Sequence, residues 1–197
     1  MTDISIDSTR AANDLLGALG EQLAAQRECF TIAVVGGSAL LALGLISRAT
    51  RDVDVLAIVD GDQLTSAQPL PGALVGAAQT VARDFGLSED WLNPGPTSLL
   101  DLGLPEGFFE RAQRRHYGPG LEVLFASRVD QIHLKLYATV DQGAGKHLKD
   151  LQALAPTERE LLDAASWSQT HDPSDGYRSV LARVLNYFGI DDGPLGF

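Results

Sequence analysis

Two aspartates separated by a single valine are the residues of this chain whose types and spacing best suit chemistry. Asp52-Val53-Asp54-Val55 alternates acidic and apolar side chains, and successive side chains of a strand point to opposite faces. In a strand, both carboxylates would share one face, roughly 6–7 Å apart, while the valines enter a core. Such a pair suits a divalent cation, above all Mg²⁺ that carries substrate phosphates.

A turn of small residues precedes the two acids. Gly36-Gly37-Ser38 follows the β-branched run Thr31–Val35 and opens an apolar segment that reaches Ile46. This order predicts a buried strand, a tight turn and a helix packed on a sheet. Backbone N–H groups, a hydroxyl and the positive end of a helix together favour a phosphate.

Neither feature is specific alone, because Gly-Gly turns and Asp-x-Asp segments are common on solvated structure. Their conjunction, in this order on a strand–helix–strand unit, favours metal-assisted chemistry on a phosphate-bearing substrate. The polar connection before the acids contains Arg48, for which three roles are open. It contacts a phosphate, orients Asp52 or forms a structural ion pair.

The remaining patterns predict an α/β (α+β) fold, with a small mixed sheet flanked by helices and a mostly helical C-terminal part. Gly86 should end one helix, and Thr157 to Glu160 form a capping box for another. Residues after 188 should fray. We expect helices over residues 8–27, 38–46, 73–85, 127–140, 146–154, 157–169 and 174–188, strands over 31–35, 52–59 and 121–126, a connection over 61–72, and a short helix or turn over 108–115.

The composition indicates a globular domain without a membrane segment. No apolar run approaches the roughly 18 residues of a membrane span, and the N-terminal residues lack the apolar core of a signal peptide. A single cysteine, Cys29, cannot form an internal disulfide, so we expect a cytoplasmic location. The net charge of −11 opposes nucleic-acid binding. A local basic group, Arg111, Arg114, Arg115 and His116, is either a nucleic-acid contact or a solvated helix end.

Two blocks of the chain carry a family resemblance. Residues 36–40 (Gly-Gly-Ser-Ala-Leu) and 48–55 (Arg-Ala-Thr-Arg-Asp-Val-Asp-Val) resemble the signature of the polymerase-β-like nucleotidyltransferase superfamily. They look like its bacterial AbiEii/MenT-type branch, which includes toxins of toxin–antitoxin and abortive-infection systems. Residues 134–138 (Leu-Lys-Leu-Tyr-Ala) and 146–154 (Lys-His-Leu-Lys-Asp-Leu-Gln-Ala-Leu) are similar to its downstream pattern.

The resemblance implies a Mg²⁺-dependent enzyme that moves a nucleoside monophosphate from a nucleoside triphosphate to an acceptor by two-metal in-line transfer. Asp52 and Asp54 would hold the metal. Glu122, between Leu121 and Val123, is either the third carboxylate that superfamily members often use or a solvated strand glutamate. Nucleotide-binding residues would be Gly36, Gly37, Ser38 and Arg48, with the turn holding the β- and γ-phosphates.

The downstream block implies two further catalytic residues. Lys135 would neutralise charge on the triphosphate, and Asp150 would act as a base on the acceptor or fix Lys135. The expected domains are a nucleotidyltransferase core over residues 1–126 and a helical part over 127–197 that completes the active-site cleft.

The acceptor and the partners stay open. A toxin-like enzyme would modify a tRNA 3′ end and have a cognate antitoxin, whereas the acidic charge favours a small molecule or a protein as acceptor. A non-catalytic binding member of the fold is the third alternative. The intact Gly37, Ser38, Asp52 and Asp54 argue against it.

Overall fold

The computed structural model describes residues 5–190, and the chain forms two compact units, Met1–Ser127 and Arg128–Phe197. The expected division, after residue 126, lies one residue earlier. The expected fraying after residue 188 falls mostly on residues 191–197, outside the described range. Across residues 5–190, the structure contains no helix with both the length and the apolar character needed to span a bilayer.

The first unit is built on one mixed sheet. Its described strands pair in the order β3-β2-β1-β6-β5, and β4 pairs with β2 next to the start of that strand. The pairs β1–β6 and β2–β4 are parallel, and the others are antiparallel. The strands are β1 (Phe30–Val35), β2 (Val53–Asp60), β3 (Gln63–Ser66), β4 (Leu92–Asn93), β5 (Gln113–Tyr117) and β6 (Leu121–Phe125).

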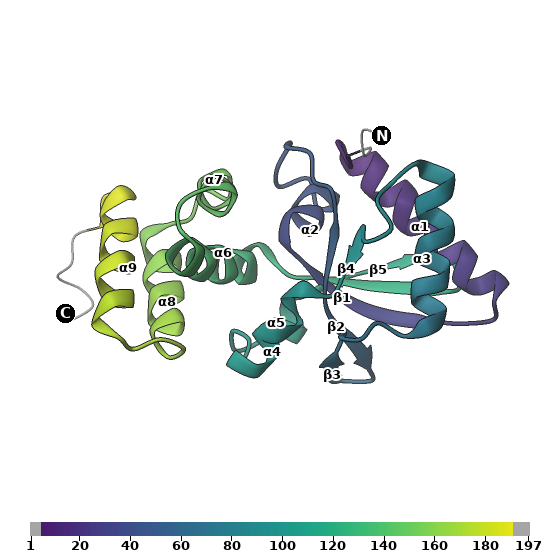
Figure 1. Cartoon of the computed structure of the whole chain (residues 1–197). Helices are drawn as coiled ribbons and strands as arrows, with labels where there is room; N and C mark the ends of the chain where they lie inside the picture. Colours follow the sequence, from purple (N-terminus) through teal and green to yellow (C-terminus); the bar gives the residue numbers. More distant parts are fainter. Residues whose placement is uncertain (1–4, 191–197) are drawn as a thin grey trace. The chain divides into compact units, whose positions relative to one another are not determined.

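Helices flank this sheet, and two of them, α1 (Thr9–Ala25) and α3 (Gly72–Phe85), lie side by side against it (Figure 1). The core between these helices and the sheet includes Ile32 and Val34 of β1 and Val53 and Val55 of β2. Burying each such side chain contributes about 1.5–3 kcal/mol. The remaining helices of this unit are α2 (Gly36–Ala42), the 3₁₀ turn η1 (Gly95–Ser98), α4 (Leu99–Leu102) and α5 (Phe108–Arg111).

The ends of the predicted helices follow local sequence signals. Ser8 caps α1 by accepting a hydrogen bond from the backbone of Ala11, and Gly86 ends α3 in the left-handed conformation with φ of 68°. Helix α2 differs from the expectation, because it begins at Gly36 and ends at Ala42 rather than Ile46.

Three strands, β3, β4 and β5, were not expected from the sequence. β3 lies inside the segment predicted as a connection. The segment predicted as a short helix or turn, 108–115, begins with the helix α5, and β5 starts within its last three residues. β5 reads Gln-Arg-Arg-His-Tyr and lies at the edge of the sheet, where polar side chains are common. Its pairing depends on β6, and its own sequence has no alternating apolar pattern.

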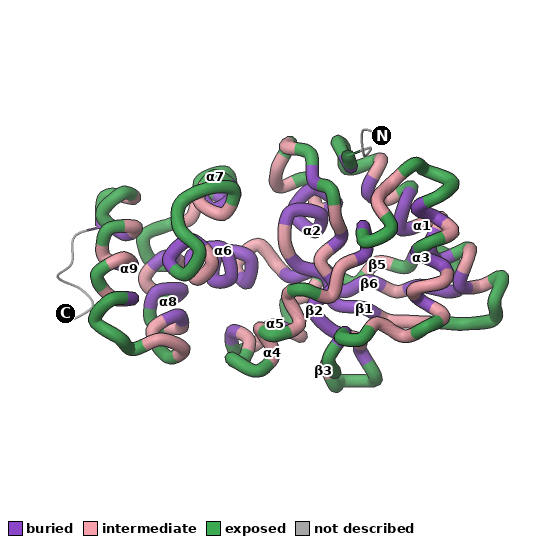
Figure 2. The backbone as a smooth tube through the Cα atoms, in the orientation of Figure 1, coloured by how far each residue is buried: buried purple, intermediate pink, exposed green. Residues whose placement is uncertain are grey.

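The second unit is helical over the residues described. It consists of α6 (Arg128–Gln142), α7 (Lys146–Ala153), α8 (Glu158–Gln169) and α9 (Asp175–Tyr187). Helix α6 is buried along most of its length (Figure 2), because the other three helices pack against it. The predicted capping box is present: Thr157 and Glu160 exchange hydrogen bonds at the start of α8. The fold is therefore mixed α/β with a helical C-terminal part, as predicted.

Candidate active site

The alternation of acids and valines is present at the start of β2. Val53 and Val55 are 1% and 0% exposed, and both belong to the core. Asp52 and Asp54 are each half-buried. Asp54 lies within the strand, whereas Asp52 immediately precedes it. The core fixes which face the valines occupy, so the carboxylates are directed away from it.

The carboxylate of Asp54 lies between β4 and Gly36, the first residue of α2. On one side, Asn93 of β4 pairs with Asp54 in the sheet and donates from its Nδ2 to Asp54 Oδ1 at 3.3 Å. On the other side, Gly36 has a φ of 78°, and a Cβ placed on it would lie only 2.1 Å from Asp54 Oδ2. A side chain at position 36 would therefore meet both backbone strain and the carboxylate.

Asp52 has a side-chain donor of its own. The hydroxyl of Thr50 donates to Asp52 Oδ1 at 3.1 Å. Thr50 is 7% exposed and exchanges two backbone hydrogen bonds with Ile6, of 2.8 and 2.9 Å. Because the backbone of Thr50 is held in this way, the hydroxyl reaches Asp52 from a fixed position.

Arg48 lies against the second glycine of the turn. A Cβ placed on Gly37 would be 2.9 Å from Arg48 Nη2 and 3.3 Å from Thr50 Oγ1. The guanidinium also donates to the carbonyl of Ala49 at 3.2 Å. The structure therefore brings together Gly36, Gly37, Arg48 and Asp54, four of the predicted site residues, and a cation lies against Gly37.

Ser38 is almost fully buried. The residue is 2% exposed, and within residues 5–190 its Oγ has no hydrogen-bond partner. Buried polar atoms are normally paired in native proteins. A buried hydroxyl of this kind, directly after two glycines in the chain, suits a polar ligand or an ordered water molecule.

The structure does not bring Glu122 to the two aspartates. Across β1, Glu122 pairs with Thr31 whereas Asp54 pairs with Val35, four positions further along the strand. At about 3.3 Å per residue this offsets them by roughly 13 Å along β1, with the width of two strand pairings in addition. The carboxylate of Glu122 instead pairs with Arg114 at 3.1 Å and His116 at 3.5 Å. Of the two roles left open for Glu122, this register does not favour that of a third metal ligand.

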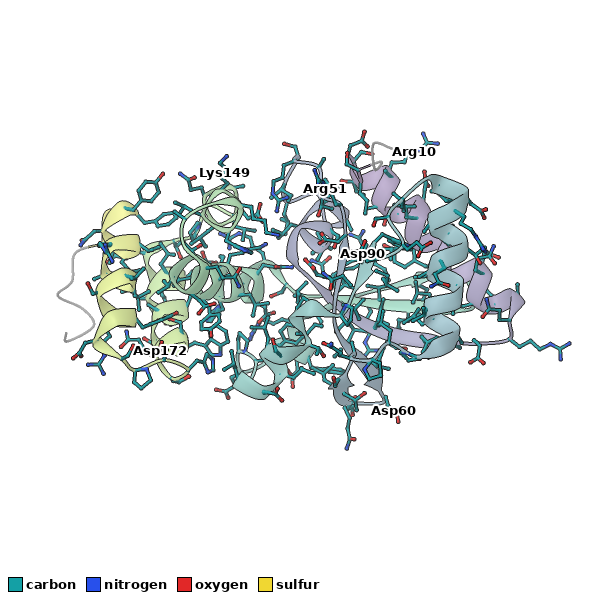
Figure 3. The ribbon with its side chains drawn as sticks, viewed as in Figure 1. Arg10, Arg51, Asp60, Asp90, Lys149 and Asp172 are labelled. Atoms are coloured by element: carbon teal, nitrogen blue, oxygen red, sulfur yellow. The ribbon has the colours of Figure 1, made fainter. Side chains whose placement is uncertain are left out.

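Lys135 and Asp150 form a buried ion pair within the second unit. Lys135 Nζ lies 2.8 Å from Asp150 Oδ2, and the two side chains are 6% and 1% exposed. Gly143, with a φ of 87°, follows α6 and lets the chain reverse into α7. The break thus brings Asp150 to Lys135, whereas the next residue back, Lys149, projects into solvent (Figure 3).

Sequence reasoning missed Asn93. The sequence patterns predict no element for the segment around it, residues 90–96. Asn93 is separated from Asp54 by 39 positions in the chain. No local spacing rule connects residues that far apart, so only the pairing of β2 with β4 reveals this contact.

The donors at Asp52 and Asp54 fit a magnesium ion. Carboxylate oxygens are the ligands that Mg²⁺ prefers. Residues 5–190 hold no group of three or more His, Cys, Asp or Glu side chains that could bind a metal. Two carboxylates suffice, however, for an ion that shares its coordination with water and substrate phosphates.

Comparisons with protein-family models, curated proteins and solved structures find no match to this chain.

Proposed function

We propose that the protein is a Mg²⁺-dependent nucleotidyltransferase that moves a nucleoside monophosphate from a nucleoside triphosphate to an acceptor. The observation that carries the proposal is the contact of the Gly36 turn with Asp54, where a Cβ would lie 2.1 Å from the carboxylate. A phosphate-binding turn and a metal-binding acid must be neighbours in such an enzyme, because the metal ion carries the phosphates.

The candidate site residues of the first unit have roles that follow from their surroundings. Asp52 and Asp54 would hold Mg²⁺, which when bound supplies positive charge for the triphosphate and for the oxygens exchanged at phosphorus. Gly37 would offer its backbone to the β- and γ-phosphates, at a position whose Cβ would lie 2.9 Å from Arg48 Nη2. Arg48 adds a cation, and the Ser38 hydroxyl has donor capacity that no described residue uses.

In the second unit, Lys135 is assigned to the triphosphate charge by the resemblance alone. Its contact with Asp150 at 2.8 Å supports the role of Asp150 as the residue that fixes Lys135. A carboxylate that already accepts from an ammonium is a poorer base, because the nearby positive charge stabilises its ionised form.

An RNA acceptor, such as a tRNA 3′ end, follows from the toxin-like resemblance, and a cognate antitoxin is the partner that this reading implies. One observation favours a small molecule or a protein instead. Arg115 donates to the carbonyl of Ala42 at 2.9 Å, and Arg114 pairs with Glu122. Two cations of the predicted basic group are thus engaged within the unit, in a chain with a net charge of −11.

The direct test is transfer of label. The protein is incubated with each α-³²P-labelled nucleoside triphosphate and Mg²⁺, in separate reactions with total cell RNA, with a protein extract and with a metabolite extract. Incorporation into one fraction identifies the acceptor class. Calorimetric titration with each triphosphate, with and without Mg²⁺, tests the first step alone. Absence of binding at millimolar concentration in every case would overturn the proposal.

A further inference from the structure

We propose that Asn93 is a positioning residue that fixes the carboxylate of Asp54 for metal binding; this inference rests on the proposed function. Asn93 lies on β4, the short strand that pairs with β2 at Val53 and Asp54. Nothing in the sequence pattern of residues 52–55 requires it. Its contact with Asp54 exists only because the sheet brings the two segments together.

The orientation of the Asn93 amide is set by a second hydrogen bond. The backbone N–H of Gly95 donates to Asn93 Oδ1 at 2.7 Å, the contact that defines an Asx-turn. Because the side-chain oxygen of Asn93 accepts from Gly95, its side-chain nitrogen faces Asp54 and donates to Oδ1 at 3.3 Å. The donor is therefore aimed at the carboxylate by the local backbone.

The carboxylate of Asp54 is then confined from both sides. Asn93 engages Oδ1, and the backbone of Gly36 approaches Oδ2 so closely that a Cβ there would collide with it. Three elements set its position: β2 carries it, β4 donates to it, and the first residue of α2 limits its rotation. A metal ligand held in this way loses less rotamer freedom when the ion binds.

β4 has the rigid support that a positioning residue needs. Trp91, directly before the strand, is 0% exposed and donates from its indole nitrogen to the carbonyl of Ala78 on α3 at 2.9 Å. The backbone carbonyl of Trp91 accepts from the N–H of Val53. The register of β4 against β2 is thus tied to the core, and Asn93 is placed with it.

The alternative role is purely structural, in which Asn93 only closes the turn to Gly95. The variant Asn93→Ser separates the two roles, because a serine hydroxyl can accept from the N–H of the second residue onward but is too short to reach Asp54. The matched control is Thr97→Val. Thr97 accepts from the N–H of Ala67 at 2.9 Å and donates to the carbonyl of Leu56 at 2.8 Å, so this variant weakens the same segment without touching Asp54.

The experiment measures binding of each Mg²⁺–nucleoside triphosphate by calorimetry, direct binding of Mn²⁺ by electron paramagnetic resonance, and the melting temperature. We expect Asn93→Ser to weaken metal and metal–triphosphate binding by about 10-fold or more, within the range for outer-shell partners of metal ligands. Thr97→Val should lower the melting temperature and leave both dissociation constants unchanged.

The outcomes separate this inference from the proposed function. If the wild-type chain binds the metal–triphosphate and Asn93→Ser binds it equally well, Asn93 has no positioning role and the proposed function stands. Equal weakening by Thr97→Val would also overturn the inference, because the effect would then follow from loss of local stability. If the wild-type chain binds no metal–triphosphate, the proposed function fails and the inference fails with it.

Discussion

Gly36 and Asp54 are in contact across the start of the sheet: a Cβ on Gly36 would lie 2.1 Å from Asp54 Oδ2. The φ of Gly36, 78°, is also one that L-residues rarely adopt. The chain therefore needs glycine here for two separable reasons, and each has its own measurable cost.

Replacement of Gly36 by alanine should destabilise the first unit and remove triphosphate binding. The backbone conformation alone costs about 1–2 kcal/mol for a residue with a side chain, and the collision displaces Asp54. Gly44→Ala is the matched control, because Gly44 has a φ of 72° with nothing within 4 Å of its Cβ position. Chemical unfolding and calorimetry measure both variants. A Gly36→Ala variant that is no less stable than Gly44→Ala and still binds would contradict the contact.

Asp54→Asn should abolish transfer and metal-dependent triphosphate binding while the chain stays folded. An amide is a weaker ligand for Mg²⁺ than a carboxylate, yet it keeps the size of the side chain. The control is Asp60→Asn, at the exposed far end of the same strand (Figure 3), which should behave like the wild type. Circular dichroism and calorimetry compare the two. Unchanged binding in Asp54→Asn would remove this aspartate from the site.

Lys135→Met should destabilise the second unit by about 3–5 kcal/mol, because removal of one partner leaves the buried carboxylate of Asp150 without its counter-charge. The double variant Lys135→Met/Asp150→Leu should recover most of that stability, since an apolar pair of similar volume is often tolerated. Chemical denaturation of the wild type, the single variant and the double variant measures the free energy of unfolding that tests this.

Transfer activity in the same variants distinguishes a structural from a catalytic Lys135. If the ammonium acts on the triphosphate, the double variant regains stability but not transfer. A double variant that transfers label at the wild-type rate would show that the pair only supports the fold, and Lys135 and Asp150 would leave the set of catalytic residues.

Glu160 should make the stability of the second unit sensitive to acid. The hydrogen bond from Arg128 is the largest cause that lowers the pKa of Glu160 from 4.5 to about 2. A depressed pKa in the folded state contributes stability that is present above pH 4.5 and lost as the pH falls through 2. After allowance for solvent screening of the partly exposed pair, Glu160→Gln should cost about 1–2 kcal/mol at pH 7.

The measurement is unfolding free energy between pH 7 and pH 2. The difference in unfolding free energy between the wild type and Glu160→Gln should shrink as the pH falls. Protonation of the Glu160 carboxylate removes the same interaction in the wild type. Glu158→Gln is the control, in the same first turn of α8 but without the contacts to Arg128. A constant difference across the pH range would show that the ion pair does not carry the effect.

The features that the sequence predicted correctly are those that depend on residues close together in the chain. Alternation in residues 52–55 identified both the strand and its buried face, because a strand repeats every two residues. Gly86 and the capping box at Thr157 marked helix ends, since such signals act within one turn. These features required no knowledge of the rest of the fold.

What the sequence could not predict depends on register between distant strands. The pattern around Glu122 identified a strand, but the alignment of β6 with β1 decides how far that carboxylate lies from Asp54. β5 was missed because its edge position relaxes the apolar pattern. Asn93 was missed because its partner lies 39 positions away.

The anchoring of α2 at both ends has a consequence for how a ligand would enter this site. Gly36, at its first residue, abuts Asp54, while the carbonyls of Leu41 and Ala42, in its last turn, accept from Thr9 of α1 at 2.7 Å and Arg115 of β5 at 2.9 Å. The turn cannot shift without breaking contacts to three other elements. Its shape therefore exists before any ligand arrives, so association should show little ordering entropy and an on-rate limited by encounter rather than by rearrangement.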